Sequence, residues 1–241
     1  LNTHSVFRWQ HGMFPCLDLD FVLELNPDMI ICLIDDILSI KEGLRARNTD
    51  IFHLWELFAW REEEVWFSNF IADSVGKIRG REIPFYIYPK KGGHENFYNL
   101  ISNHDIKKAY LSFPITGIHG AELEEIESFK AAIGQKLVVF DPYAIKDREL
   151  ILTYQTLKDE SDAEVMPGLK KASFKDRKLF PDAKWYIELD DISPLSLSTI
   201  SFPPELKGRD LLSVIKTIDS QIISRDHLLI DQSDIVVIYI K

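Results

Sequence analysis

Two sets of carboxylates lie beside apolar runs, where acid–base groups and metal ligands of α/β proteins are commonly found. Asp226 belongs to a helical pattern that leads into residues 235–240, an unbroken apolar run rich in β-branched residues. Asp35 and Asp36 directly follow another apolar run, residues 29–34. A carboxyl group can transfer a proton, and a carboxylate at a strand tip can hold Mg²⁺ on a nucleotide. Asp226 is therefore the candidate for catalysis, and Asp35 and Asp36 are candidates for nucleotide binding.

A third apolar run, residues 108–114, predicts a strand that ends in a proline turn and carries Tyr110, Ser112 and Pro114. Asp141 follows the next predicted strand in the same way. Parallel sheets bind ligands at the carboxyl ends of their strands, so the tips of these two strands are where a ligand is expected. Tyr110 and Asp141 also have structural explanations, since a strand aromatic commonly fills the core and an Asp-Pro pair commonly ends a strand.

The charged candidates have structural alternatives as well. Asp226 can be a solvated helix carboxylate that pairs with Arg225 or His227. Asp35 can cap the helix that follows it, and Arg61, a candidate phosphate contact, can pair with a neighbouring Glu. Both interpretations stay open on the sequence alone.

The elements that position these residues alternate between strand and helix, which predicts an α/β fold with parallel sheets covered by helices. The pattern indicates two three-layer units, residues 1–103 and residues 104–241, with an insertion or lid at residues 158–208. Buried strands are expected at residues 29–34, 83–88, 108–114, 137–140 and 235–240, with a further possible strand at residues 185–189. Helices are expected at residues 20–26, 37–47, 50–79, 95–101, 121–133, 145–157 and 209–231.

Composition favours a soluble, cytoplasmic-type protein. The chain has 241 residues, of which 46% are hydrophobic and 27% charged, and no run approaches the ~18 apolar residues of a membrane span. A net charge of −10 disfavours a nucleic-acid partner. Cys16 and Cys32, the two cysteines, are expected to be reduced core residues. The seven histidines form no H-E-x-x-H motif or close ligand pair, so no metal site is expected.

The N-terminal half resembles nucleotide kinases of the adenylate kinase type, which are P-loop proteins. The resemblance covers about residues 1–100 and is carried by Asn2-Thr3-His4, Pro27-Asp28, Asp35-Asp36 and Trp60-Arg61. It implies a metal-side carboxylate at Asp35 or Asp36 and a phosphate contact at Arg61. No G-x-x-x-x-G-K-[ST] loop occurs in the sequence. ATP and Mg²⁺ are therefore expected only if a phosphate loop precedes Leu1.

The C-terminal half resembles nucleoside deoxyribosyltransferases, over about residues 106–241. Residues 108–114 are similar to the opening strand of that family, and residues 224–226 with residues 234–237 are similar to its helix and strand. The resemblance implies a Rossmann-like second unit in which the tip of residues 108–114 lines a nucleoside pocket, so that Tyr110, Ser112, Pro114 and, after the next strand, Asp141 are candidates for substrate binding. It also implies that Asp226 contacts the base and assists proton transfer. Tyr110 and Asp226 should then meet at the mouth of one crevice above adjacent strands.

The family's nucleophile is a glutamate in a Gly-rich segment after the strand at residues 235–240, where the sequence ends. That glutamate would lie beyond Lys241 or come from a neighbouring subunit, which implies a homo-oligomer. The first functional hypothesis is cleavage or (deoxy)ribosyl transfer at the N-glycosidic bond of a nucleoside or nucleotide, without a cofactor. The alternatives are a nucleotide-sensing module without catalysis and a nucleotide kinase with a phosphate loop before Leu1.

Overall fold

A computed structural model describes residues 1–9, 12–47, 52, 54–114, 121–147, 186–187, 200–201 and 208–240, with side chains in all of these except residues 186–187, 200–201 and 208–216. The chain divides into two compact units. The first comprises residues 1–35, 60–145 and 223–241, and the second comprises residues 36–59 and 146–222. The predicted boundary at residue 103 lies within the first unit and stays a prediction.

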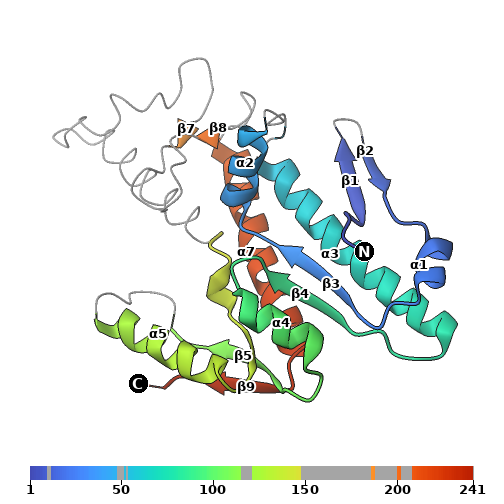
Figure 1. Ribbon diagram of the computed structural model, residues 1–241. Helices are drawn as coiled ribbons and strands as arrows, with labels where there is room; N and C mark the ends of the chain where they lie inside the picture. Colours follow the sequence, from blue (N-terminus) through green and yellow to red (C-terminus); the bar gives the residue numbers. More distant parts are fainter. Residues whose placement is uncertain are drawn as a thin grey trace, which may run out of the picture. The chain divides into compact units, whose positions relative to one another are not determined.

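The described residues form a mixed α/β protein, as expected, and the order of elements follows the hydrophobic pattern (Figure 1). The helices are α1 (Leu19–Leu25), α2 (Ile37–Ala46), α3 (Leu54–Arg79), α4 (His94–Ser102), α5 (Ala121–Gly134) and α7 (Gly208–Asp231), with a 3₁₀ turn η1 at Pro142–Ala144. The strands are β1 (Val6–Trp9), β2 (Gly12–Pro15), β3 (Ile30–Ile34), β4 (Phe85–Pro89), β5 (Lys108–Ser112), β6 (Val138–Phe140), β7 (Tyr186–Ile187), β8 (Ile200–Ser201) and β9 (Ile235–Ile238).

Short polar residues and glycine begin and end the helices. Asp18 accepts a hydrogen bond from the Asp20 N–H and caps α1, and Asn26 ends that helix in the left-handed region at φ 48°. Asp36 caps α2 through the Ser39 N–H. Gly80, with φ 66°, follows α3, where a residue with a Cβ would be strained.

Two parallel sheets lie in the first unit. β3 and β4 pair in parallel, with Ile30 opposite Phe85 and Ile34 opposite Pro89. The second sheet has the order β6-β5-β9, and Tyr110 of β5 is opposite Phe140 on one side and Val236 on the other. The carboxyl ends of β5, β6 and β9 therefore meet at one edge, as the sequence predicts.

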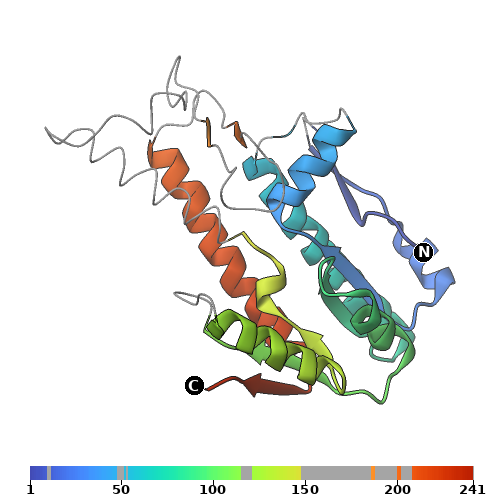
Figure 2. The same ribbon diagram turned by 60° about the vertical axis from the view of Figure 1, so that its left-hand side comes forward.

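Helices α5 and α7 cover opposite faces of the β6-β5-β9 sheet. Tyr110, Val138 and Phe140 belong to one core cluster with Leu229 of α7. Side chains alternate along a strand, so Leu111 lies on the other face, where the Phe129 ring of α5 packs 5.3 Å from Tyr239. Both views show α5 running along this sheet and α7 leading through a short turn into β9 (Figure 1, Figure 2).

Two amide side chains satisfy the backbone at the outer edges of these sheets. Gln232 accepts a hydrogen bond from the Ile87 N–H at 2.9 Å and donates to the Ile87 carbonyl at 3.0 Å. Asn96 forms the same pair of bonds with the N–H and carbonyl of Val139, each 2.7 Å long. Each amide thus replaces one residue of a neighbouring strand and protects a sheet edge.

The prediction that residues 29–34 and 235–240 form strands buried on both faces is wrong. Leu33 of β3 is 54% exposed, and Val236, Ile238 and Ile240 are 48%, 60% and 83% exposed. β9 ends the strand order of its sheet in the described part of the chain, and its exposed residues alternate with the half-buried Ile235 and Val237, so one face of the strand is less covered than the other.

Polar contacts attach the N-terminal hairpin of β1 and β2 to α3. The strand β2 was not expected from the sequence. Glu64 of α3 accepts hydrogen bonds from the His4 ring at 2.5 Å, the Ser5 hydroxyl at 2.6 Å and the Ser5 N–H at 2.9 Å. Both cysteines were expected to be core residues. Cys32 of β3 is buried, as expected, but Cys16, which follows the hairpin, is exposed. Burial is the main cause that raises the pKa of the Cys32 thiol to about 12.

Several expected segments lie wholly or largely outside the described residues. Most of the helix expected at residues 145–157 and most of the insertion at residues 158–208 belong to this group. Within the insertion, β7 lies where a strand was expected and pairs with β8 in antiparallel fashion. None of the helices in the described ranges is long and apolar enough to cross a membrane.

Candidate active site

The candidate site lies at the carboxyl edge of the β6-β5-β9 sheet. Tyr110, from the central strand β5, is 9% exposed. Leu229, one helical turn after Arg225 and Asp226 on α7, packs in the same core cluster as Tyr110. Asp141 directly follows β6. The structure thus brings together three of the residues that the sequence singled out.

The surroundings of Tyr110 shift its titration. Burial is the main cause that raises the pKa of Tyr110 to about 12, and the negative charges of Asp226 and Asp141 contribute in the same direction, while the Arg225 guanidinium partly offsets them. The phenol therefore stays protonated at neutral pH and can donate a hydrogen bond to a ligand.

Asp226 holds its proton more strongly than an exposed aspartate. Burial raises its pKa, and this effect exceeds the opposing influence of Arg225 and His227. Its side chain is 27% exposed, and its Oδ1 lies 3.4 Å from Arg225 Nη2. The pairing with Arg225, which the sequence left as an alternative, is present, but the carboxyl group is not simply solvated. A carboxyl group with a raised pKa is suited to general acid catalysis.

Two cations support the site, and one of them was missed by the sequence analysis. Arg225 is buried, and its Nη2 lies 3.4 Å from the Pro142 carbonyl oxygen. Lys130 of α5 lies 2.6 Å from Asp141 Oδ2. Its only signal in the sequence is the spacing of three from Glu127, which is also the pattern of a surface helix pair.

Ser112 and Pro114 lie at the carboxyl tip of β5. Ser112 is half-buried, and its carbonyl accepts the Tyr239 N–H at 2.8 Å. Pro114 is exposed. The loop that follows, residues 115–120, lies outside the described residues, so the substrate-binding role of both residues stays a prediction.

The nucleotide-binding candidates of the N-terminal half have structural partners. Asp35 is 9% exposed, and its Oδ2 lies 3.3 Å from Lys90 Nζ. Arg61 donates from Nη1 to the Asp35 carbonyl at 3.1 Å, which differs from the Glu pairing left open above. Asp36 caps α2, as described. Asp35 and Arg61 thus meet at the carboxyl end of β3, and their nucleotide role stays a prediction.

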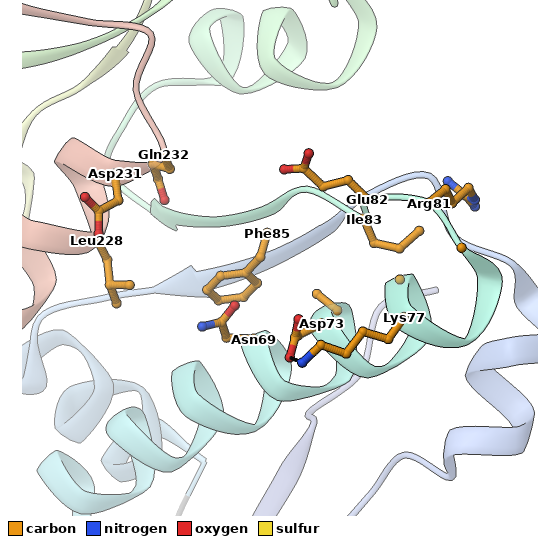
Figure 3. A pocket seen from close by; sticks show the side chains of 13 residues that line it. Asn69, Asp73, Lys77, Arg81, Glu82, Ile83, Phe85, Leu228, Asp231 and Gln232 are labelled. Atoms are coloured by element: carbon orange, nitrogen blue, oxygen red, sulfur yellow. Dashed lines mark hydrogen bonds and ion pairs between the residues drawn. The ribbon is translucent and has the colours of Figure 1, made fainter.

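A hollow of about 670 Å³ lies elsewhere in the first unit, around the Phe85 ring at the start of β4 (Figure 3). It is lined by the second half of α3, the loop into β4 and the end of α7, and contains none of the predicted site residues. Lys77 in its wall pairs with Asp73 at 2.5 Å, and Arg81 donates to the Pro27 carbonyl at 2.8 Å. The hollow has the volume of a ligand site, but both of these cations form contacts with other groups of the protein.

No cluster of three metal-ligating side chains occurs among the residues that the structure describes. Comparison with known proteins adds no assignment, because no family of proteins, no curated protein and no solved structure matches the chain.

Proposed function

We propose that the protein cleaves or transfers at the N-glycosidic bond of a nucleoside or nucleotide. The observation that carries this proposal is the meeting of a buried, protonated phenol, Tyr110, with a carboxyl group of raised pKa, Asp226, at the carboxyl edge of a parallel sheet. Ligands of α/β proteins bind at such edges. The resemblance of this half to nucleoside deoxyribosyltransferases, with a Rossmann-like sheet, supports the same chemistry.

In the proposed mechanism Asp226 donates its proton to the leaving base while the bond from the anomeric carbon to the base nitrogen breaks. Tyr110 donates a hydrogen bond that orients the substrate. A second carboxylate forms a bond to the anomeric carbon as the base leaves, and water or an acceptor base then displaces that carboxylate, as in retaining glycosidases. Asp141 is not suited to that role, because Lys130 and the Tyr143 N–H hold its two oxygens. The resemblance assigns the nucleophile to a glutamate after Lys241 or from a second subunit.

A second candidate is a nucleotide-sensing module that binds the same ligand without cleaving it. The cations beside Asp141 and Asp226 favour it, because each reduces the nucleophilicity of the carboxylate next to it. We place either function in the cytoplasm, with a small nucleoside or nucleotide as the partner.

The test is release of free base from deoxynucleosides, ribonucleosides and nucleoside monophosphates, measured by chromatography. General acid catalysis contributes on the order of 10²–10⁴ in rate, so Asp226→Asn should lower release at least about 100-fold. Asp219→Asn, on an exposed turn of the same helix, is the matched control and should leave the rate unchanged.

Equal rates for wild type and Asp226→Asn would contradict the assigned role of Asp226. Binding of nucleosides by the wild type, measured by calorimetry, without any base release would favour the sensing module over the enzyme.

A further inference from the structure

The turn after β6 is held by cations from two different helices. Asp141 Oδ1 accepts the Tyr143 N–H at 2.8 Å, and Oδ2 lies 2.6 Å from Lys130 Nζ. The next carbonyl, that of Pro142, lies 3.4 Å from Arg225 Nη2. Since Lys130 comes from α5 and Arg225 from α7, the turn is held from both faces of the sheet.

Lys130 is suited to a fixed position. Its side chain is 18% exposed, it lies 2.8 Å from Glu127 Oε1, and its ammonium group lies 5.6 Å from the centre of the Phe113 ring. Burial alone would lower the pKa of Lys130, but Asp141 and Glu127 raise it overall, so the lysine stays charged at neutral pH. Its charge is therefore available to Asp141 at neutral pH.

These contacts form a chain that ends at the proposed acid. Lys130 holds Asp141, the neighbouring Pro142 carbonyl contacts Arg225, and Arg225 lies 3.4 Å from Asp226. Without its lysine, Asp141 would remain a half-buried carboxylate, and Arg225 already contacts the carbonyl of the next residue, Pro142. Asp141 would then compete with Asp226 for that guanidinium.

We propose that Lys130 is a positioning residue for Asp226, acting through the turn at Asp141 and Pro142 and through Arg225. It keeps Asp141 occupied, so that Arg225 stays beside Asp226. The charged groups that act on Asp226 are Arg225 and His227 on α7. Tyr110 on β5 lies near enough to both Asp226 and Asp141 for their charges to raise its pKa. The inference rests on the proposed function only in giving Asp226 a catalytic task.

The first test is the titration of the Asp226 carboxyl group by ¹³C NMR in the full chain, assigned by comparison with Asp226→Asn. Lys130→Met should raise the pKa of Asp226, because Arg225 is drawn toward Asp141. Lys130→Arg should restore most of the wild-type titration. Lys136→Met, which removes an exposed lysine just after α5, is the matched control and should have no effect.

Asp141→Asn provides the second variant, and it also covers the case in which Lys130→Met fails to fold. An asparagine keeps an acceptor for the Tyr143 N–H but carries no charge to compete for Arg225. Lys130→Met should therefore leave the Asp226 titration unchanged in the Asp141→Asn background. A shift of equal size in both backgrounds, or no shift in either, would overturn the proposal, since a purely structural lysine does not act through the charge of Asp141.

Kinetics separate the two proposals. Misplacement of a catalytic group acts on the chemical step, so Lys130→Met should lower kcat for base release about tenfold and change KM less than about twofold. If the wild type releases no base, the proposed function fails, and the NMR titration still decides the role of Lys130.

Discussion

Tyr110 and Asp226 both hold their protons to higher pH than exposed side chains do, and burial is the main cause for each. The charge of Asp226 also raises the pKa of Tyr110. Glu64 shows the opposite behaviour. Burial raises its pKa too, but hydrogen bonds from His4 and Ser5 outweigh that effect and lower it overall. Glu64 has donors in both His4 and Ser5, whereas Asp226 has Arg225 as a donor at 3.4 Å, so the balance between burial and hydrogen bonding differs between the two carboxyl groups.

The raised pKa of Asp226 predicts how stability changes with pH. Its folded-state pKa lies above the ordinary value of 3.8, so its contribution is fully present below that value and is lost as pH rises through the folded pKa. Asp226→Asn has no such charge and should gain stability relative to the wild type as pH rises from about 3 to 7. Urea unfolding at a series of pH values measures this difference, and Asp219→Asn is the control. A difference that is the same at every pH would contradict the raised pKa.

At the scale of elements, the amides of Gln232 and Asn96 replace missing strands at two sheet edges. Gln232 lies at the turn between α7 and β9 and bonds both backbone groups of Ile87 in β4. The same turn that leads α7 into β9 is thereby attached to the other parallel sheet of the first unit. Its position bears on the site, because Arg225 and Asp226 lie about two helical turns earlier on α7.

Gln232→Ala should lower the free energy of unfolding by about 1–3 kcal/mol, because the Ile87 N–H and carbonyl lose their partners. Chemical denaturation measures the loss, and hydrogen exchange of the Ile87 amide should become faster. Asn103→Ala removes a hydrogen bond between two exposed amides, Asn103 and Asn99, and should change stability by less than about 0.5 kcal/mol. Equal effects of the two substitutions would show that the contact to β4 has no special role.

Much of the element order could be predicted from the sequence, because hydrophobic period distinguishes strands from helices locally. Tyr110 and Asp141 could be placed near one sheet edge, because parallel strands align their carboxyl ends, whereas the expectation that Asp226 of the helix joins them came only from the family resemblance. Lys130 could not be predicted, because its contact with Asp141 depends on how α5 packs. The exposure of Ile238 could not be predicted either, because an apolar run does not tell what covers each face of the strand. Local pattern thus predicts elements, and packing decides which side chains meet.

At the scale of the whole molecule, two features have opposite effects on self-association. The net charge of −10 separates copies of the chain in solution. β9 ends its sheet in the described part of the chain and exposes Val236 and Ile238 on one face, which is typical of an edge that can pair with another chain. Salt screens the first effect and leaves the second unchanged.

Sedimentation velocity should therefore show more self-association of the wild type as ionic strength rises. Ile238→Lys places a charge on the β9 edge and should reduce that association. Ile223→Lys is the matched control, since Ile223 on α7 has nearly the same exposed fraction, 59% against 60%, and the change in net charge is identical. Association that is equally reduced by both substitutions would point to net charge alone and not to β9.

The difference in exposure between the two cysteines allows the opening of the fold to be measured. A thiol-specific label reacts with the exposed Cys16 in the native protein, whereas Cys32, buried in β3 with its thiol pKa raised to about 12, is reached only when that strand separates from its neighbours. Mass spectrometry distinguishes singly from doubly labelled chains. The rate at which the second label appears then measures how often the β3–β4 core opens, and any nucleoside that stabilises the folded chain should slow it.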